Sequence, residues 1–441
     1  MFACRAWPRA LTSPLEALSD AKIKAPRGTF DILGESASKR MLLESRARAI
    51  LEGAGYERIE TPTFEATDLF ARGVGESTDI VRKEMFTLQD GAGRSLTLRP
   101  EGTAPVCRAY VEHGMHKRRQ PVKLWYLSSF FRHERAQAGR YRQFWQVGAE
   151  AIGSADPALD AESIVLLSRL LTEMGVRDVR LRLSSLGGIE GRSVYRQRLQ
   201  EHLRANQEHL SEEVRARIDL NPLRAFDSDH PGTRGVMESA PRLLEHLSAE
   251  DAEHFAEVRA LLDVAGVAYE IDSTLVRGLD YYSRTVFELT SDALGAQSGV
   301  GGGGRYDGLV EMIGGNPNPT SRTPGIGWAA GIERIMLAGE SPVTASAPVE
   351  LFIAVQAPDG EIRRAAFELL SEARSAGLSA QMDLGGRSLK GQLGHAAALG
   401  VRYVAIVADD HSTLKDMEGG AQEDLVTNTV VHAVLRGLHD L

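Results

Sequence analysis

The feature that most constrains the fold is a pair of aromatic-rich segments joined by a basic connection. "VKLWYLSSFFRHE" (122–134) and "RQFWQVGAEAIG" (142–153) flank the connection "RAQAGRY". Two segments of strand length with a glycine-containing connection predict an antiparallel hairpin. Successive side chains of a strand point to opposite faces, so the second segment has one apolar face suited to a core. Its other face carries Phe144, Gln146, Gly148 and Glu150.

The polar face of this hairpin predicts a binding site. Arg132 and Glu134 share one face of the first segment. Arginine pairs with phosphate or carboxylate through two donors, and carboxylates accept from an ammonium or another cationic N–H donor. Phe144 offers a ring that can stack on a base, and Gly148 leaves space for a ligand against the backbone. A solvated sheet face remains the alternative for any single residue, whereas the set together favours the handling of a nucleotide and an amino acid.

Three further segments add candidate residues. "SLTLRPEGTAPVCRAYVEHG" (95–114) predicts strand, turn and helix, with Arg99, Glu101 and Thr103 at one parity. "LVRGLDYYSRTVFEL" (275–289) begins and ends like a strand but is interrupted by polar residues, which fits an exposed edge, a solvated hairpin or a binding site. "GGGGRYDGL" (301–309) is not a Walker loop, because no Gly-Lys-Ser/Thr follows. A flexible loop and a close backbone approach to a ligand both remain open for it.

The remaining pattern predicts an α/β protein of several domains. Helices are expected over 41–53 and 160–174, and a charged, mostly helical subdomain over about 187–263. Strand-like sequence resumes at Ala268, and "PGIGWAAGIERIMLAG" predicts a strand that leads into a helix. "ESPVTASAPVE" is typical of a linker, and strand and helix then alternate, as in a small α/β domain. The expected divisions are a loose N-terminal extension 1–21, a catalytic domain 22–345 and a C-terminal domain 346–441.

Composition excludes some classes of protein. No apolar run approaches the roughly 20 residues of a membrane helix, so no membrane association is expected. The two cysteines, Cys4 and Cys107, have no metal-ligand spacing and build no disulfide framework, which fits a reducing cytosol. The net charge of −9 argues weakly against a nucleic-acid partner. Residues 117–142 nevertheless hold eight Lys or Arg and one acid, which indicates either a solvated basic loop or a phosphate-binding surface.

From about Lys24 onward the chain resembles class II aminoacyl-tRNA synthetases. "GYERIETPTFE", "FRHERAQAGRYRQFWQVGAE" and "PGIGWAAGIERIML" are similar to the three motifs of that class. "LVRGLDYYSRTVFE", "GGGGRYDGL" and "LRPEGT" resemble segments peculiar to the histidyl-tRNA synthetase family, of bacterial type. The resemblance implies an α+β catalytic domain, in which helices flank an antiparallel sheet and a helical subdomain is inserted. Trp145 and Ser283 depart from the residues common in the family, histidine and asparagine, without placing the function in doubt.

The resemblance also assigns a role to each candidate residue. It implies that histidine is bound by Glu101, Gly102, Thr103, Gln146, Glu150, Arg277, Tyr281 and Tyr282. It implies that ATP is bound by Arg132, Glu134, Arg140, Phe144 and Arg334. Arg132 and Arg277 would be the catalytic residues, and Arg135 and Gln137 would meet the acceptor end of the tRNA.

The implied reaction joins L-histidine to tRNA(His) in two steps. Histidine and ATP give histidyl-adenylate and pyrophosphate, and histidine then passes to the 3′ end of the tRNA. ATP would carry Mg²⁺ on its phosphates, no metal held by the protein is expected, and the family implies a cytoplasmic homodimer.

"GGRSLKGQLGHAAALGVRYVAIV" resembles the family's C-terminal anticodon-binding domain. From residue 346 onward this region has 8 Lys or Arg against 13 Asp or Glu, so contact with tRNA would depend on a local patch. Arg387 and Lys390 are candidates for that patch, with a solvated loop as the alternative.

One rival shares the catalytic fold. A synthetase-like regulatory subunit of ATP phosphoribosyltransferase senses histidine without charging tRNA. That subunit typically lacks the C-terminal domain and has a degraded arginine–tyrosine motif. This chain has both the C-terminal domain and the arginine–tyrosine motif. A tRNA-binding scaffold is a third class, but it would not need a pocket of Glu101, Gln146 and Glu150.

Overall fold

The structure is a computed structural model. It describes residues 22–439 apart from 76–77, 136, 138, 296–297, 315–321, 341–348, 358 and 409–410. The chain divides into two compact units, residues 1–341 and 342–441. The predicted extension 1–21 and most of the predicted linker lie outside the described residues. The assignment of domains to functions therefore stays a prediction.

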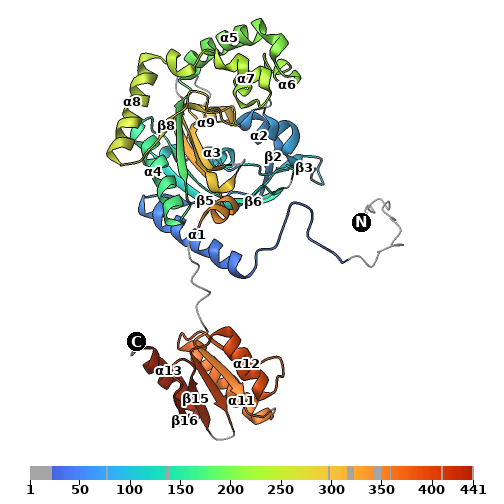
Figure 1. The fold of residues 1–441 in the computed structure, drawn as a ribbon, viewed down its shortest axis with the longest axis vertical. Helices are drawn as coiled ribbons and strands as arrows, with labels where there is room; N and C mark the ends of the chain where they lie inside the picture. Colours follow the sequence, from blue (N-terminus) through green and yellow to red (C-terminus); the bar gives the residue numbers. More distant parts are fainter. Residues whose placement is uncertain are drawn as a thin grey trace, which may run out of the picture. The chain divides into compact units, whose positions relative to one another are not determined.

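The first unit is built on a large, mainly antiparallel sheet (Figure 1). Within the described residues it has eight strands, and only the short edge pairs β1–β5 and β7–β8 are parallel. The predicted hairpin is confirmed, because β5 and β6 pair from Val122↔Ile152 to Phe131↔Gln143. In spatial order the strands are β1 (Glu57–Arg58), β5 (Val122–Phe131), β6 (Gln143–Ile152), β11 (Gly325–Gly331), β10 (Gly299–Arg305), β9 (Ser283–Ser291), β7 (Val179–Ser185) and β8 (Glu270–Ile271).

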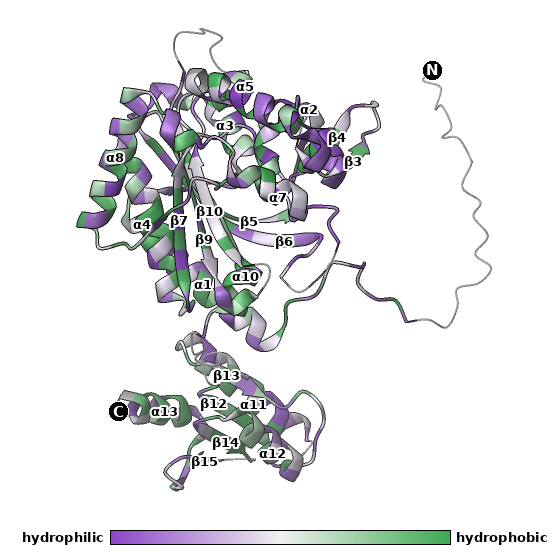
Figure 2. Cartoon of the chain, turned by 45° about the horizontal axis from the view of Figure 1, so that its top comes forward, coloured by the Kyte–Doolittle hydropathy of each residue, from purple (hydrophilic) through white to green (hydrophobic). Residues whose placement is uncertain are grey.

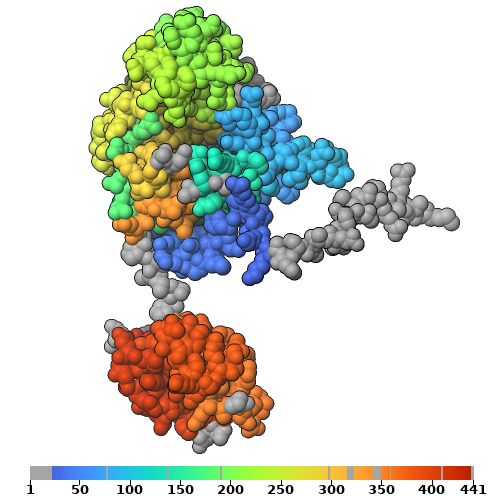
Figure 3. All heavy atoms as spheres, turned by 45° about the vertical axis from the view of Figure 1, so that its right-hand side comes forward, coloured from blue at the N-terminus to red at the C-terminus, as the bar shows by residue number. Residues whose placement is uncertain are grey.

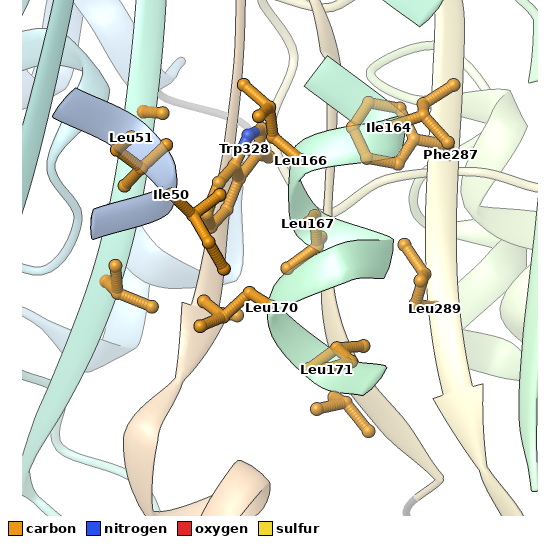
Figure 4. Close-up of a cluster of buried hydrophobic side chains, with 14 of the residues drawn as sticks. Ile50, Leu51, Ile164, Leu166, Leu167, Leu170, Leu171, Phe287, Leu289 and Trp328 are labelled. Atoms are coloured by element: carbon orange, nitrogen blue, oxygen red, sulfur yellow. The ribbon is translucent and has the colours of Figure 1, made fainter. Parts of the chain in front are cut away.

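One face of this sheet is closed by helices over an aliphatic core. The helices are α1 (Gly34–Gly53), α4 (Pro157–Glu173), α8 (Ala249–Val264) and α10 (Ile332–Ala338). Figure 4 shows Leu167 and Leu170 of α4 between Ile50 of α1 and Leu289 of β9, with Trp328 of β11 next to Ile50. Burying one such leucine contributes roughly 1.5–3 kcal/mol, so these contacts fix the sheet against its helices. The apolar face predicted for residues 145–149 lies in this core, as the parity argument requires.

The other face carries a second core and the smaller elements. Val106, Cys107 and Tyr110 of α3 pack against Leu124 and Tyr126 of β5. The sequence predicts a polar binding surface on this face, but tyrosines and apolar side chains also fill much of it. The elements on this side are α2 (Thr67–Val74), α3 (Thr103–Glu112), α9 (Leu309–Met312), a π-helical turn (Ile80–Glu84) and a small sheet of β2 (Phe64–Ala66), β4 (Ser95–Leu98) and β3 (Phe86–Gln89).

The predicted helical subdomain is present between β7 and β8. It contains α5 (Ile189–Ala205), α6 (Glu212–Arg215), α7 (Pro231–Glu238) and the core-facing α8. Two of the short helices begin with side-chain caps. The Ser211 hydroxyl accepts from the Val214 amide of α6, and the His230 ring accepts from the Thr233 amide of α7. We call residues 189–264 the helical insertion; Figure 1 shows α5, α6 and α7 beyond one end of the large sheet.

The structure resolves one alternative about strands and corrects one expectation. The glycine run, for which a loop was one alternative, is strand β10, which pairs with β9 and β11 and appears nearly white beside β9 in Figure 2. The strand expected from Ala268 onward shrinks to the two residues of β8, and regular pairing resumes only at Ser283. Pairing with other strands decides whether such a segment becomes a strand. The hydrogen bonds from β9 and β11 make the glycine run a strand, and the local sequence does not show this.

The second unit is a small α/β domain, as the alternation of strand and helix predicts. Its described part has a five-stranded sheet in which β12 pairs parallel with both β13 and β14. Alternate residues of β12 face opposite helices, so Leu351 and Ile353 share a core with α11 while Phe352 and Ala354 lie in a cluster with Ala396 of α12. Its elements are β12 (Leu351–Val355), α11 (Gly360–Ser375), β13 (Ala380–Met382), α12 (Leu389–Leu399), β14 (Tyr403–Val407), β15 (Ser412–Asp416), β16 (Gln422–Leu425) and α13 (Val430–His439). None of the helices described in either unit is long and apolar enough to span a membrane.

Candidate active site

A cleft of about 320 Å³ lies over β6, β10 and β11, on the face opposite the aliphatic core. Seven residues predicted from the sequence line it, although they come from distant parts of the chain. They are Arg132, Glu134, Arg140, Phe144, Gln146, Arg277 and Arg334. The whole lining has four arginines against three glutamates, Glu134, Glu288 and Glu333, so it carries a small net positive charge that favours an anion.

Each arginine in the cleft is oriented by protein contacts. Arg132 Nε donates to the Pro100 carbonyl at 2.9 Å, and its guanidinium lies 5.3 Å from the centre of the Phe144 ring. Glu134 lies between two arginines, with Oε1 3.8 Å from Arg132 and Oε2 3.6 Å from Arg140. These half-exposed ion pairs stabilise the fold little. They do hold two guanidinium groups at one end of the cleft, next to an aromatic ring.

Arg277 is held on the opposite side of the cleft by an acid that the sequence analysis missed. Its Nη1 donates to Glu288 Oε1 at 2.9 Å, and Arg182 reaches the other oxygen of Glu288 at 3.2 Å. Burial opposes the charge of Arg277, but Tyr282 and Glu288 outweigh it and raise the pKa of the guanidinium. Gly302 leaves room for the Arg277 side chain. A Cβ at this position would lie 3.1 Å from Arg277 Nη2 and 2.5 Å from the Phe287 carbonyl oxygen.

A buried acidic pocket adjoins the cleft along β6. Glu101 accepts hydrogen bonds from the amides of Thr103 and Ala104 at 2.8 and 2.9 Å, at the N-terminus of α3. The Thr103 hydroxyl donates to Glu150 Oε1 at 2.8 Å, which links α3 to β6. Tyr306 donates to the other Glu150 oxygen at 2.8 Å. Carboxylate, hydroxyl and amide groups from three elements therefore converge on one small volume.

Both carboxyls of the pocket are strongly perturbed. Burial raises the pKa of Glu150 to about 8, against the lowering effect of its hydrogen bonds from Tyr306 and Thr103. Burial also raises the pKa of Glu101, although the amides at the start of α3 oppose the shift. Glu150 therefore takes up a proton near neutral pH when the pocket holds no cation. A ligand that offers N–H donors or positive charge would return it to the carboxylate form.

The two tyrosines of the interrupted segment close this pocket together. Tyr281 lies with its hydroxyl 3.5 Å from Glu101 Oε2, and its ring centre is 4.8 Å from that of Tyr282. Neighbouring residues of a regular strand point apart, so this placement requires an irregular backbone. The structure has that backbone, since no helix or strand covers residues 272–282.

The structure separates two of the predicted residues from the cleft. Arg135 and Gln137 lie in the connection between β5 and β6 and are not part of the cleft lining. Gln137 pairs with Arg140 through backbone hydrogen bonds of 3.0 and 2.9 Å, which closes the connection into a tight turn. Their neighbours Ala136 and Ala138 are outside the described residues.

The space expected beside Gly148 is filled by the protein. A Cβ at Gly148 would lie 2.4 Å from the Tyr126 hydroxyl oxygen, so this glycine admits Tyr126 and not a ligand. Tyr126 and Tyr306 were both missed by the sequence analysis. Tyr126 had a signal in its even parity on β5, opposite Gly148 in the register. Tyr306 had only its position after the glycine run.

Trp145 lies on the far side of β6, as its parity predicts. Its amide donates to both Glu333 oxygens at 3.2 and 3.1 Å, and the Arg40 guanidinium stacks 4.1 Å from its ring. Glu333 belongs to α10 and also lines the cleft. The hydrogen bond therefore joins the backbone of β6 to α10. Among the described residues, no group of three or more His, Cys, Asp or Glu side chains is placed to hold a metal ion.

The fold has close counterparts among solved structures. The crystal structure of apo S. aureus histidyl-tRNA synthetase superposes with a TM-score of 0.78 at 33% identity, covering 94% of this chain and 100% of that one. The antiparallel sheet with its flanking helices and the C-terminal α/β domain are thus those of a class II aminoacyl-tRNA synthetase.

Sequence comparison narrows the class. The profile of the histidyl-tRNA synthetase family matches residues 28–335. A histidine–tRNA ligase of Desulforamulus reducens is 45% identical over 416 residues, 92% of this chain and 97% of that relative. One of Halorhodospira halophila is 45% identical over 434 residues, 96% and 99% of the two chains. The chain belongs to the histidyl-tRNA synthetase family.

Proposed function

We propose that this protein activates L-histidine with ATP in the cleft and transfers it to the 3′ end of tRNA(His). One observation carries the proposal. The acidic pocket around Glu150 and the arginine-lined cleft lie on the same face of β6, with Gln146 and Arg277 lining the cleft. An amino acid in the pocket would therefore present its carboxylate to a nucleotide in the cleft.

The pocket has a complementary group for each part of histidine. Glu101, Gly102 and Thr103 at the start of α3 face the ammonium group, which would compensate the buried charge of Glu101. Gln146 and Arg277 take the carboxylate. Glu150, Tyr281 and Tyr282 surround the imidazole, whose N–H donates to the Glu150 carboxylate. The raised pKa of Glu150 supports this role, because a buried carboxyl with few donors is poised to accept one.

ATP occupies the cleft. Arg132 and Arg334 contact its phosphates, Glu134 and Arg140 lie on the nucleotide side, and the adenine stacks on Phe144. Mg²⁺ arrives on the phosphates, since this ion keeps much of its hydration and is usually bound through substrate phosphates and one or two carboxylates. Glu134 and Glu288 are carboxylates of the cleft lining that fit such a contact.

The chemistry consists of positioning and charge stabilisation. A carboxylate oxygen of histidine attacks the α-phosphorus in line, the bond to the bridging oxygen breaks, and pyrophosphate leaves. Arg132 and Arg277 on either side of the α-phosphate stabilise the charge that develops there. A terminal ribose hydroxyl of the tRNA then attacks the carbonyl carbon of histidyl-adenylate, and AMP leaves.

The tRNA would meet both units. Arg135 and Gln137, in the connection at the edge of the cleft, face the acceptor end. The second unit binds the anticodon, where Lys390 is exposed and Arg387 pairs with Asp383 at 2.6 Å. Cytoplasmic location and a homodimer complete the proposal, as in the family that the motifs indicate.

The test is charging of tRNA. The purified protein, supplied with ATP, Mg²⁺, labelled histidine and a tRNA(His) transcript, should form histidyl-tRNA that is lost on mild alkaline hydrolysis. A folded protein that binds histidine but charges no tRNA would instead support the histidine-sensing alternative. A folded protein that neither binds histidine nor charges tRNA would contradict the assignment of the pocket.

A further inference from the structure

The segment that carries Arg277 has little support from its own backbone. Between Asp272 and Ser283 the described chain forms no helix or strand. One backbone bond links Leu275 to Asp272 at 3.2 Å, and another links Asp280 to Val74 at 3.3 Å. A segment without regular secondary structure depends on contacts with its surroundings to keep one conformation. We call residues 275–282 the arginine loop.

Side chains of the helical insertion contact the arginine loop at three points. Asn221 Nδ2 donates to Asp280 Oδ1 at 2.9 Å, and Arg224 Nη2 donates to the Gly278 carbonyl at 3.5 Å. Arg192 Nη1 of α5 donates to the Tyr282 carbonyl. The three acceptors span the stretch that joins Arg277 to the two tyrosines. The insertion therefore supports the backbone that the catalytic sheet leaves unsupported.

The contacting part of the insertion is itself anchored beside the site. Asn221 N donates to the Arg217 carbonyl at 2.8 Å, and Arg217 Nη2 pairs with Asp79 Oδ1 at 2.9 Å. The Arg217 side chain is only 15% exposed, and the pair joins the insertion to the segment that follows α2. Figure 3 shows the yellow-green insertion against the blue segment that follows α2.

A cavity of about 170 Å³ adjoins these contacts. Arg192, Asn221, Asp280 and Arg277 line it, so Arg277 faces the insertion on one side and the catalytic cleft on the other. The arginine loop can be displaced into this cavity if its lateral contacts are removed. Displacement of a catalytic group by about 1 Å can lower a rate on the order of 100-fold.

We propose that the helical insertion positions the catalytic arginine, and that Asn221 is the positioning residue through its bond to Asp280. This inference rests on the proposed function, because it assigns Asn221 to the adenylation step. Asn221 touches neither substrate. It acts by holding Asp280, three residues from Arg277, and so fixes the geometry in which Arg277 meets the reacting carboxylate.

The test compares two asparagine-to-alanine variants of the insertion. Asn221→Ala should lower kcat of histidine-dependent pyrophosphate exchange about 10- to 100-fold, the range for a lost hydrogen bond to a charged group. It should raise KM for histidine and leave KM for ATP within about twofold. Asn206→Ala is the matched control, since Asn206 Nδ2 donates at 2.9 Å to the His202 carbonyl within the insertion alone. The control should keep wild-type kinetics.

A swap of the two side chains tests the bond itself. Asn221→Asp alone places two carboxylates together and should lower kcat at least as far as Asn221→Ala. Asn221→Asp combined with Asp280→Asn restores a donor and an acceptor in the same space and should recover most of the lost activity. No recovery in the double variant would contradict the role of this bond.

Hydrogen exchange gives a readout that does not depend on activity. The peptide covering the arginine loop should exchange faster in Asn221→Ala than in wild type or in Asn206→Ala, with the melting temperatures of the variants within a few degrees. Unchanged exchange of this peptide, or kinetics of Asn221→Ala equal to those of the control, would overturn the inference. Absence of pyrophosphate exchange in wild type would overturn the proposed function, and the exchange rate of the peptide would still decide whether Asn221 holds the loop.

Discussion

At the scale of single residues, Glu150 is a candidate for ligand recognition whose negative charge is disfavoured by burial. It has no exposed surface and accepts hydrogen bonds from Thr103 and Tyr306. Its pKa of about 8 lies well above the ordinary value of a glutamate, because burial disfavours the charged form. An empty pocket therefore becomes less stable as the carboxyl loses its proton. In the proposed function, a bound imidazole would relieve that cost, which would couple histidine binding to the charge of this one side chain.

Glu150→Gln should change how stability depends on pH. The folded-state pKa is raised from 4.5 to about 8, so its stabilising contribution is complete below 4.5 and is lost as the pH rises through about 8. Glutamine has no proton to lose. The melting temperature of the wild type without ligand should fall relative to that of Glu150→Gln between pH 6 and pH 9, as thermal melts would measure. A constant difference over this range would contradict the raised pKa.

Arg277→Ala should separate binding from chemistry. Tyr281, Glu101 and Glu150 remain in the pocket, so histidine should still bind, as isothermal titration would show. Adenylation should slow by about 100- to 1,000-fold or more, by analogy with the loss of one preorganised donor in a site of this kind. Arg180→Ala is a suitable control, because Arg180 lies on β7 and forms an exposed ion pair with Asp292. This pair is not part of the cleft lining. Normal adenylation in Arg277→Ala would contradict its role.

Sequence parity located part of this site and missed the rest for a physical reason. The alternation along residues 144–150 placed Gln146 and Glu150 on one face, which the strand pairing bears out. Glu288 and Tyr306 could not be located in the same way, because their relation to Arg277 and Glu150 depends on the register of β9 and β10. The space beside Gly148 was misjudged because its occupant, Tyr126, lies on the neighbouring strand.

At the scale of elements, β10 is a strand made mostly of glycine, which by itself is a poor strand former. It persists because β9 and β11 pair with it on both sides. The absence of side chains lets Arg277 lie over Gly302. The same glycines made the sequence ambiguous between a loop and a binding surface. Pairing with strands distant in the sequence resolves that ambiguity. The local sequence pattern holds no information about this pairing.

Gly302→Ala should destabilise the sheet. The new Cβ would lie 2.5 Å from the Phe287 carbonyl oxygen and 3.0 Å from the Glu288 Cα, so backbone atoms of β9 must move. Overpacking of this kind costs roughly 1–3 kcal/mol of unfolding free energy, as chemical denaturation would measure. Gly191→Ala in α5 is the control, because nothing lies within 4 Å of its new Cβ. That change should stabilise the protein by about 0.5–1 kcal/mol, and equal effects of the two changes would contradict the packing described here.

At the scale of the whole molecule, the two units have separate cores. Among the described residues, the two large clusters of the first unit contain none beyond Ala338, and those of the second unit contain none before Val349. Each unit thus has the buried apolar residues of an independent domain. The alternation of strand and helix after the linker predicted the second unit well, because its strands pair mostly with near neighbours in the sequence.

A chain that ends at Glu340 should keep the first step and lose the second. The cleft and the acidic pocket lie wholly within residues 1–341, so histidine-dependent pyrophosphate exchange should stay within about tenfold of the full chain. Charging of tRNA(His) should fall much further, because the proposed anticodon-binding unit is absent. Comparing the two assays on the truncated and full chains measures this difference. Equal loss in both assays would contradict a division of labour between the units.

The measurement that tests the central claim most directly is exchange of labelled pyrophosphate into ATP, with each standard amino acid offered in turn. We expect histidine alone to support exchange, since the proposed pocket pairs an imidazole N–H with the Glu150 carboxylate between Tyr281 and Tyr282. We also expect Glu150→Ala to remove the histidine-dependent signal while the protein remains folded. A folded wild-type protein that binds histidine yet gives no exchange, or that exchanges equally well with another amino acid, would contradict the account.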